Sequence, residues 1–415
     1  MRILEVAMSG TIGTRYMGPI SNDILQLSNR FAARGHEVVV CDVTTHESRE
    51  LLHRDVELLE VPGTSENHLT SLARKPNRVE STLRSWHNYH RIVRHIASHL
   101  RSWDADVIHF HSSVPLFIAQ RMHRFETFYT SHTPVWSLDA GCSKSLVARF
   151  EAWVELQAIR GSRLTIALGD YLARSVPDAD ITTIPNGIAA NEWDVIDRSN
   201  ARRVLGIDER AFVVLFVGRI AQVKGVDIFL DAVKSLAPSL TDLRAFAIGA
   251  LSGSFDTRDD HLDPYAQQLL EAARGLPVQF LGFISNRTLE FRQYLAAADV
   301  TVVPSRHEPQ GNVVLESLIM GTPVIGSDTG GIPDMVSADV GYLFRPGDVA
   351  ALAARIKQAH DHPDELVAKG SRSRARMVAH YSWDDVADRY LAAFRKRITP
   401  DQSLGCTARP AVGSR

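Results

Sequence analysis

Cysteine is scarce in this chain of 415 residues, and the three that occur, Cys41, Cys142 and Cys406, stand far apart. An odd number of cysteines at these separations argues against a disulfide framework and indicates a reducing compartment. No C-x-x-C spacing occurs, so the usual paired-cysteine zinc motifs are missing. The sequence therefore predicts a cytoplasmic protein without a metal site of that kind.

Long apolar runs and an excess of charge of one sign are missing as well. No apolar run approaches about 18 residues, the length that a membrane-spanning helix needs. The first residues, MRILEVAMSG, are typical of a short strand and not of a signal peptide. A formal net charge of −2 gives no reason to expect a nucleic acid as partner. At roughly 150 residues per domain, the length predicts two or three globular domains.

Short apolar runs alternate with amphipathic helical stretches along the whole chain, which is typical of parallel sheets covered by helices on both faces. Pro185, Asn186 and Gly187 interrupt the pattern after the seventh run, and a new series follows. The pattern predicts an α/β protein with two doubly wound, Rossmann-like domains in tandem. The expected strands are RILEVAM, EVVVCDV, VELLEV, DVIHFH, TFYTS, LTIAL and ITTIP, then FVVLFVG, AFAIG, VQFLGF, DVTVVPS and TPVIGS.

Two helices can be placed by their apolar faces. In ISNDILQLSNRFAARGHE, the residues Ile24, Leu27 and Phe31 share one face with Ala32, and Gly35 is expected to end the helix. The last helix, SWDDVADRYLAAFRKR, has an apolar side formed by Trp383, Val386, Tyr390 and Phe394. The polar tail over residues 399–415 is expected to be disordered.

The stretch EPQGNVVLESLIMGTPVIGSDTGGIPD, residues 308–334, carries two glutamates among many small residues. Because it follows an expected strand, Glu308 should lie in a loop at the carboxyl edge of a parallel sheet, where ligands bind. Gly311 and Asn312 should begin the next helix, which places Glu316 about one turn inside it, some ~6 Å along the axis. A helix start attracts phosphate, so the stretch predicts a phosphate with a polyol beside it. The alternative is an ordinary loop with two solvated glutamates.

A second stretch, LFVGRIAQVKG, places Arg219 and Lys224 just after another strand. The two cations could neutralise a diphosphate, since arginine offers a fork of donors and lysine a point charge. Cations near a helix are common on surfaces, so this stretch alone is a weak signal. Its place at the same sheet edge as residues 308–334 favours a shared anion site.

At this point the chain resembles a known family, the retaining glycosyltransferases of family 4 (GT4), which includes sucrose synthases and many bacterial sugar transferases. The resemblance rests on the E-x7-E pair Glu308 and Glu316 and on an ordered set of motifs over nearly the whole chain. These motifs are RGHEVVV, DVIHFHS, YTSHTP, IPNG, VGRIAQVKG, FLGFIS, ADVTVVPSRHEPQGNVVLES, GTPVIGSDTGGIPD and YSWDDVADRY. The resemblance implies the GT-B fold, in which two Rossmann-like domains face a central cleft.

In the second half, the resemblance implies a site for a sugar nucleotide. Arg219 and Lys224 would hold the donor diphosphate. Glu308 would lie beside the donor sugar, and Glu316 would bind the ribose hydroxyls. The other implied donor contacts are the backbone at the helix start and the segment that brackets the base: Gly311, Asn312, Val313, Phe283 and Ile284.

In the first half, the resemblance implies that His132 reaches the transferring sugar and that Gly18 passes close to the diphosphate. Many members of the family carry paired glycines in the loop of Gly18, whereas this chain has Pro19 there, which stiffens the turn and removes an N–H donor. Gln310 stands where a bulky apolar residue is common, which points to an altered choice of sugar.

The implied chemistry follows from charge. Breaking the anomeric bond leaves a nucleoside diphosphate anion and an oxocarbenium-like sugar, so fixed cations and helix N–H groups would stabilise the transition state. No metal or other cofactor is expected if Arg219 and Lys224 supply the positive charge. The family retains the anomeric configuration, and the leaving phosphate would help to deprotonate the acceptor. We expect Glu308 to orient the sugar and not to act as a nucleophile.

The domain assignment also follows from the resemblance. Residues 1–193 would bind the acceptor and residues 194–382 the nucleotide sugar, while the helix over 383–397 would pack back on the first domain.

UDP is the expected nucleotide of the donor, and GDP is its main competitor. The sugar would be a hexose such as glucose or N-acetylglucosamine. The acceptor could be a small polyol or aminocyclitol, a natural product, a growing glycan or a lipid-linked sugar.

Two rival functions stay open at this point. A sugar-nucleotide epimerase or a phosphorylase could use the same fold, and the appearance of sugar on an acceptor would separate transfer from these. A dinucleotide-binding regulator is the rival from another class. The chain lacks G-x-G-x-x-G after its first strand, which counts against NAD.

Three further features have a functional and a structural interpretation. The pair Asp104 and Asp106 could bind a metal, but its place before a buried strand favours a structural role. His109 and His111 could also be metal ligands, yet no further ligand is evident, so we expect satisfied core histidines. The acidic loop SGSFDTRDDHLDPY could be a lid, and a solvated loop is the simpler expectation.

The basic stretch near residues 78–103 carries an apolar stripe with arginines beside it. A peripheral membrane contact is one interpretation. A helix that packs its stripe on the first sheet is the interpretation that we favour. The stripe consists of Leu83, Trp86, Val93, Ile96 and Leu100, and the arginines are Arg84, Arg91, Arg94 and Arg101.

Overall fold

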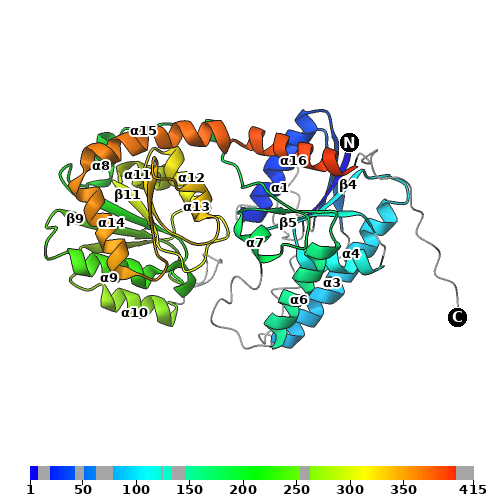
Figure 1. Ribbon diagram of the computed structural model, residues 1–415, viewed down its shortest axis with the longest axis horizontal. Coiled ribbons are helices and arrows are strands. Elements are labelled where there is room, and N and C mark those ends of the chain that lie inside the picture. The colour runs from blue at the N-terminus through cyan, green and yellow to red at the C-terminus, as the bar shows by residue number, and fades with distance from the viewer. Residues whose placement is uncertain are drawn as a thin grey trace.

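The computed structural model describes residues 1–7, 19–42, 51–61, 78–122, 125–132, 134, 146–252 and 262–398. Gly18, the tail over 399–415 and residues 253–261 of the acidic loop lie outside these residues, as do the side chains of residues 78–85. Two parallel sheets, each covered by helices, form the two ends of the molecule (Figure 1). The predicted pair of doubly wound domains is confirmed.

The first sheet has seven parallel strands in the order β3-β2-β1-β4-β5-β6-β7. Its inner strands are buried because helices cover both faces, whereas the edge strands β3 and β7 are partly exposed. The strands are β1 (Arg2–Val6), β2 (Glu37–Asp42), β3 (Val56–Glu60), β4 (Val107–Phe110), β5 (Thr127–Ser131), β6 (Leu164–Ala167) and β7 (Ile181–Thr183). The helices are α1 (Pro19–Ala33), α3 (Arg78–His99), α4 (Ser113–Met122), α6 (Leu146–Gly161) and α7 (Tyr171–Ser175).

The second sheet has six parallel strands in the order β10-β9-β8-β11-β12-β13. The strands are β8 (Phe212–Val217), β9 (Leu243–Ile248), β10 (Val278–Gly282), β11 (Val300–Val303), β12 (Val324–Ser327) and β13 (Gly341–Phe344). β13 is not among the strands predicted from the sequence. It is an edge strand of four residues that begins with glycine, so its apolar run is too short to stand out.

The helical segments of the second half connect these strands and lead back to the first half. They are η2 (Ala190–Glu192), α8 (Arg198–Leu205), η3 (Gln222–Lys224), α9 (Val226–Leu236), α10 (Pro264–Ala272), α11 (Leu289–Ala297), α12 (Asn312–Ile319), α13 (Ile332–Met335), α14 (Val349–Asp361), α15 (Pro363–His380) and α16 (Trp383–Ile398). In both sheets the strand order reverses direction beside the first strand, between β1 and β4 and between β8 and β11. Ligands of open α/β sheets bind at the carboxyl ends of the strands at such a point.

The last helix, α16, leaves the second domain and packs on the first. Figure 1 shows α15 running along the second domain and α16 continuing beside α1. The predicted apolar side of α16 is buried, with Trp383, Val386, Tyr390 and Phe394 at most 3% exposed. The predicted face of α1 is buried with it, and Gly35 has a φ of 76° just beyond the end of α1, as expected for a helix stop.

The carboxyl edges of the two sheets meet. Asn186, which follows β7, exchanges two hydrogen bonds with the side chain of Gln310, which follows β11. The backbone N–H of Asp170, after β6, donates to Asp334, after β12, at 3.0 Å. The residues that follow the strands of both sheets can therefore act on one ligand. Among the described residues, no helix is both long and apolar enough to cross a membrane.

Removal of the Phe394 ring tests whether α16 is part of the first domain's core. This ring is fully buried and contacts Phe31, Phe128 and Tyr390. We expect Phe394→Ala to lower the free energy of unfolding by about 3–5 kcal/mol, because the cavity opens between α16 and the sheet. Denaturant unfolding measures the change. Asp388→Ala, which breaks only an exposed ion pair with Arg34, is the control and should cost less than about 1 kcal/mol. A similar loss for both variants would contradict this packing.

Candidate active site

Lys224 and Glu308 form an ion pair where the central strands of the second sheet end. Lys224 lies at the end of η3, just after β8, and Glu308 lies in the loop after β11. The Lys224 Nζ is 2.5 Å from the Glu308 Oε2, and Ser305 Oγ donates to the same oxygen at 3.1 Å. The Glu308 side chain is only 10% exposed, so its position is fixed by these two contacts. The sequence placed both residues at this edge but did not pair them.

The loop that carries Glu308 is braced by the turn that follows β12. Gly331 N donates to the Glu308 carbonyl oxygen at 3.0 Å. Gly330 has a φ of +58°, and a Cβ atom there would lie 1.8 Å from that carbonyl oxygen. Only glycine permits this approach of two backbones. The small residues of the stretch 308–334 therefore serve to hold the glutamate loop in place.

The helix α12 begins at Asn312, as the sequence predicts, with Gly311 as its N-cap. Gly311 has a φ of +93° and provides no side-chain acceptor for the first N–H groups of α12, at Asn312 and Val313. These N–H groups and the helix dipole suit an anion. Arg219 is half-buried and follows β8 at the same sheet edge. The second domain thus places Lys224 in contact with Glu308, close in sequence to the start of α12, and Arg219 follows β8 at the same sheet edge.

Glu316 lies in the second turn of α12 and is 8% exposed. Its Oε1 accepts a hydrogen bond of 2.7 Å from Asn286 Nδ2. Burial raises the pKa of Glu316, and the Asn286 contact opposes that shift. Asn286 comes from the segment GFISN after β10, in which Phe283 is 58% exposed and Ile284 packs on the core. Glu316 is therefore connected, through Asn286, to the segment that was predicted to bracket a base. Asn286 itself was not among the predicted site residues.

In the first domain, His132 follows β5 and its ring points into a buried polar network. The ring is stacked on His111, with centroids 5.2 Å apart, and His132 Nε2 is 2.9 Å from His111 Nδ1. His132 Nδ1 lies 3.5 Å from Asp23 Oδ2 on α1. Burial, and next the charge of His111, hold the pKa of His132 well below its usual range. Both ring nitrogens therefore face protein atoms.

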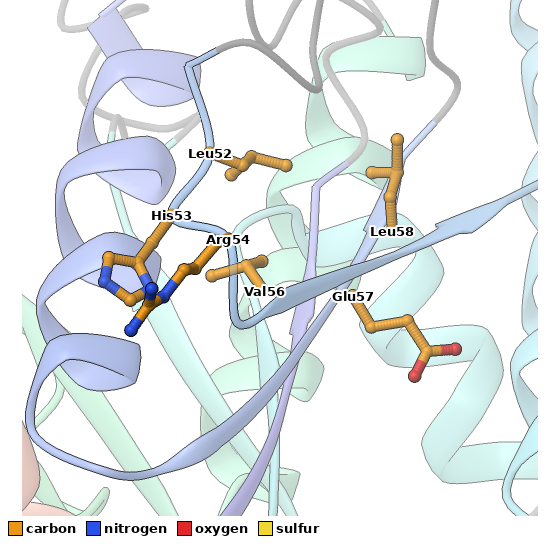
Figure 2. Close-up of a pocket in the computed structure, with 6 residues that line it drawn as sticks. All are labelled: Leu52, His53, Arg54, Val56, Glu57 and Leu58. Carbon is orange, nitrogen blue, oxygen red and sulfur yellow. The ribbon is translucent and has the colours of Figure 1, made fainter.

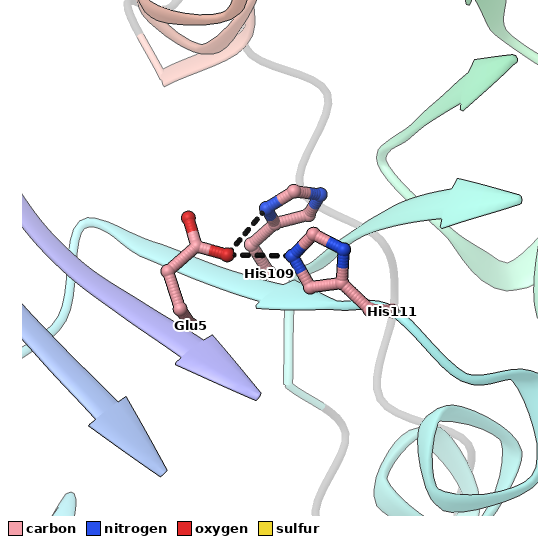
Figure 3. Close-up of side chains that lie close together, drawn as sticks. All are labelled: Glu5, His109 and His111. Carbon is pink, nitrogen blue, oxygen red and sulfur yellow. Dashed lines mark hydrogen bonds and ion pairs between the residues drawn. The ribbon is translucent and has the colours of Figure 1, made fainter. Parts of the chain in front are cut away.

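Glu5 is the residue at the centre of this network. Figure 3 shows its carboxylate directed at both His109 and His111, with Oε2 at 2.9 Å from His109 Nδ1 and 2.7 Å from His111 Nε2. Burial alone would raise the pKa of Glu5, but the two histidines outweigh it and lower the pKa to about 2. Burial and the neighbouring His109 lower the pKa of His111 to about 4.

The prediction that His109 and His111 are satisfied core histidines is confirmed. The prediction that no further ligand lies near them was wrong, because Glu5 contacts both. The ligand atoms of these three residues lie within 4.8 Å of one another, and a carboxylate with two imidazoles suits a transition metal. The oxygen-to-nitrogen distances are hydrogen-bond lengths, however, and the outer nitrogen of His109 also has a partner in Thr130 Oγ1 at 2.8 Å. We therefore treat the group as a hydrogen-bond network.

Two contacts between the domains border both halves of the site. The Gln310 amide is 2% exposed and is held by the backbone of Asn186, whose side chain hydrogen-bonds Asp23. Gln310 was expected to alter the choice of sugar. In the structure its amide group instead hydrogen-bonds the backbone of Asn186. The rings of Tyr171 and His307 lie edge to face at 5.7 Å. Burial lowers the pKa of His307 and raises that of Tyr171.

A surface hollow elsewhere does not compete with this site. It has a volume of about 460 Å³ and lies at the edge strand β3 (Figure 2). Its lining comes from one segment, and it contains none of the predicted site residues. We place the site where strand ends, cations and carboxylates converge, because shape alone identifies no chemistry.

The remaining features have structural roles where they are described. Asp106 Oδ2 accepts a hydrogen bond from the backbone N–H of Arg2 at 2.7 Å. In α3, Val93 and Ile96 are buried in the core between α3 and the first sheet, whereas Arg91 and Arg94 are exposed. The packed-helix interpretation of this stretch therefore holds for its described side chains. Asp263 is the N-cap of α10.

Comparisons with known proteins identify the family to which the chain belongs. The family model described as Glycosyltransferase Family 4 matches residues 20–192, and that described as Glycosyl transferases group 1 matches residues 197–376. The two matches fall on the two domains in turn. The chain belongs to this family of glycosyltransferases, and it is an enzyme.

Individual relatives cover most or part of the chain. It is 28% identical over 430 residues to the glycogen synthase of Mycobacterium tuberculosis strain H37Rv, covering 97% of this chain and 98% of the relative. It is 35% identical over 218 residues to the D-inositol 3-phosphate glycosyltransferase of Geodermatophilus obscurus, covering 51% of this chain and 46% of the relative. The structure of Anabaena Alr3699/HepE in complex with UDP matches with a TM-score of 0.70 at 20% identity, over 95% of this chain and 100% of that one. The fold is thus GT-B, as the resemblance implied.

Substitution of Gly330 tests how the Glu308 loop is held. We expect Gly330→Ala to lower the free energy of unfolding by at least about 2 kcal/mol more than Gly347→Ala. Gly347 is a matched control because its φ is +79°, while an added Cβ meets no atom within 4 Å among the described residues. Both substitutions strain the backbone, because both glycines have a positive φ. Only Gly330→Ala also places a Cβ atom against the Glu308 carbonyl group and pushes the two loops apart. Equal losses in denaturant unfolding would show that the close approach does not hold the loop.

Proposed function

We propose that this enzyme transfers a hexose from a UDP-sugar to an acceptor hydroxyl with retention of the anomeric configuration. The observation that carries the proposal is the convergence of Lys224, Glu308 and the start of α12 at one sheet edge. A diphosphate needs positive charge and N–H donors, and a sugar needs a fixed carboxylate beside it. The second domain offers both within one set of neighbouring loops.

One observation supports a ribonucleoside diphosphate, and a second supports UDP within that class. The buried Glu316 accepts a hydrogen bond from Asn286 about one turn from the proposed phosphate site, where a ribose would place its hydroxyls. The similar Anabaena protein was solved in complex with UDP. GDP is the alternative nucleotide.

For the acceptor we propose a small polyol or a glycan end. One similar protein is named a D-inositol 3-phosphate glycosyltransferase, and another a glycogen synthase. The acceptor would lie on the first domain, near His132. A lipid-linked sugar is the alternative acceptor.

In this mechanism the site residues stabilise the negative charge of the diphosphate and orient the sugar. Arg219, Lys224 and the first N–H groups of α12 stabilise the diphosphate as the anomeric bond breaks. An oxygen of the leaving phosphate accepts the proton of the attacking hydroxyl on the same face of the sugar, which retains the configuration. Glu308 orients the sugar and keeps Lys224 in place before the donor arrives. With two cations at the phosphate, no metal ion is required.

Neutralising Lys224 tests the phosphate site. We expect Lys224→Met to weaken UDP binding by about 10- to 100-fold, because a charge-assisted contact of about 1.5–3 kcal/mol is lost. Isothermal titration calorimetry measures the affinity. Lys357→Met is the control, since it removes the same charge from a pair with Asp361 that is 50% exposed on the lysine side. A loss that is no larger than in this control would place the diphosphate elsewhere.

A product assay tests the transfer itself. The enzyme is incubated with UDP-glucose or UDP-N-acetylglucosamine and candidate polyols or glycans in EDTA, and the product is examined by NMR. We expect sugar on the acceptor with the donor's anomeric configuration, and at least a 10-fold lower kcat for Glu308→Gln. Full activity of that variant would remove Glu308 from the site. Isomerised donor without transfer would instead identify an epimerase.

A further inference from the structure

The buried polar network of the first domain has no part in the mechanism above, yet it includes His132, a residue of the proposed site. It runs from Glu5 on β1 through His111 to His132, and from there to Asp23 on α1. Each of these residues is at most 6% exposed. Four buried polar side chains in series are costly unless each contact has one donor and one acceptor.

The direction of each hydrogen bond follows from Glu5. An ionised carboxylate only accepts, so His111 must donate from Nε2. A neutral His111 carries one ring proton, and its Nδ1 is therefore an acceptor. The proton in the 2.9 Å contact must then come from His132 Nε2. A neutral His132 consequently has its lone pair on Nδ1, the atom that lies 3.5 Å from Asp23 Oδ2.

Asp23 fits the end of this chain. Its carboxyl group is buried, and among the described residues Asp23 Oδ2 has no hydrogen-bond partner. Burial raises its pKa, which favours the protonated carboxyl group, and the side chain of Asn186 contacts it. A protonated carboxyl group can face a bare imidazole nitrogen without repulsion. Each of the contacts Asp23–His132, His132–His111 and His111–Glu5 then contains one proton, and in each of them the donor lies on the Asp23 side and the acceptor on the Glu5 side.

We propose that Glu5 and His111 are positioning residues for His132, which they hold as the Nε2–H tautomer with its Nδ1 lone pair facing Asp23. Any proton that His132 accepts during the reaction then enters at Nδ1, on the Asp23 side. The importance of this for transfer rests on the proposed function, which places the acceptor near His132. The tautomer itself does not depend on that placement.

Selective labelling of histidine with ¹⁵N tests the tautomer directly. In the wild-type enzyme we expect His132 Nε2 to be protonated and Nδ1 bare, with the signals assigned by His132→Asn and His111→Asn. In Glu5→Leu, His111 Nε2 loses its acceptor, so the proton moves to His111 Nδ1 and donates to His132. His132 should then switch to the Nδ1–H tautomer. Glu5→Gln keeps a carbonyl oxygen for both histidines and should keep the wild-type tautomer.

Three results would overturn this assignment: a wild-type His132 with Nδ1–H, an unchanged tautomer in Glu5→Leu, or a stoichiometric metal ion that is lost in Glu5→Leu. Glu155→Leu is the matched control for lost stability. Glu155 is a buried carboxylate that accepts hydrogen bonds from Tyr129 and Ser131 on the neighbouring β5. Its removal should leave the His132 tautomer unchanged.

Kinetics test whether the tautomer matters for transfer. We expect kcat of Glu5→Leu to fall roughly 10- to 100-fold with little change in KM for the donor, the range seen when the partner that orients a functional imidazole is lost. Glu5→Gln should recover most of that loss. Equal kcat values in Glu5→Leu and Glu155→Leu would refute a positioning role. If the wild-type enzyme transfers no sugar at all, the proposed function fails, and the NMR result still decides the tautomer.

Discussion

The ion pair between Lys224 and Glu308 is the contact on which the proposed donor site depends. Each residue follows a central strand of the second sheet, and the two strands are neighbours, β8 and β11. A lysine and a glutamate that are this little exposed each need the other, because an unpaired buried charge costs several kcal/mol. The pair therefore holds the ammonium group at the sheet edge. In the proposed mechanism a phosphate of the donor would replace the carboxylate as the partner of Lys224, and Glu308 would then be free to orient the sugar.

The backbone around this pair is arranged so that the side chains have little freedom. Gly330 packs closely against the carbonyl oxygen of Glu308, and Gly331 donates a hydrogen bond to it. Ser305 donates a hydrogen bond to the carboxylate of Glu308. Gln310 ties the same loop to Asn186 of the first domain. Asn186 in turn contacts Asp23, which faces His132. One run of contacts thus connects the donor loop of one domain with the polar network of the other.

The sequence was sufficient for features that depend on local pattern. Continuous apolar runs identify the parallel strands, and a strand that is followed by glycine and a helix places Glu308 and Asn312 at the sheet edge. Contacts that depend on which strands are neighbours could not be predicted in the same way. Glu5 is one charge in a short strand, and only the register that sets it opposite His109 gives it a partner. Asp23 is likewise a polar residue on a helix until the fold brings α1 against His132.

Calorimetric titration of the wild-type enzyme and Arg219→Ala with UDP, GDP, ADP and NAD, each with and without magnesium, tests the central claim most directly. The account predicts that one nucleoside diphosphate, UDP, binds tightly without metal, and that Arg219→Ala loses about 1.5–3 kcal/mol of that binding free energy. Binding of NAD alone, or of UDP with equal affinity in both proteins, would contradict a diphosphate site at the ends of β8 and β11.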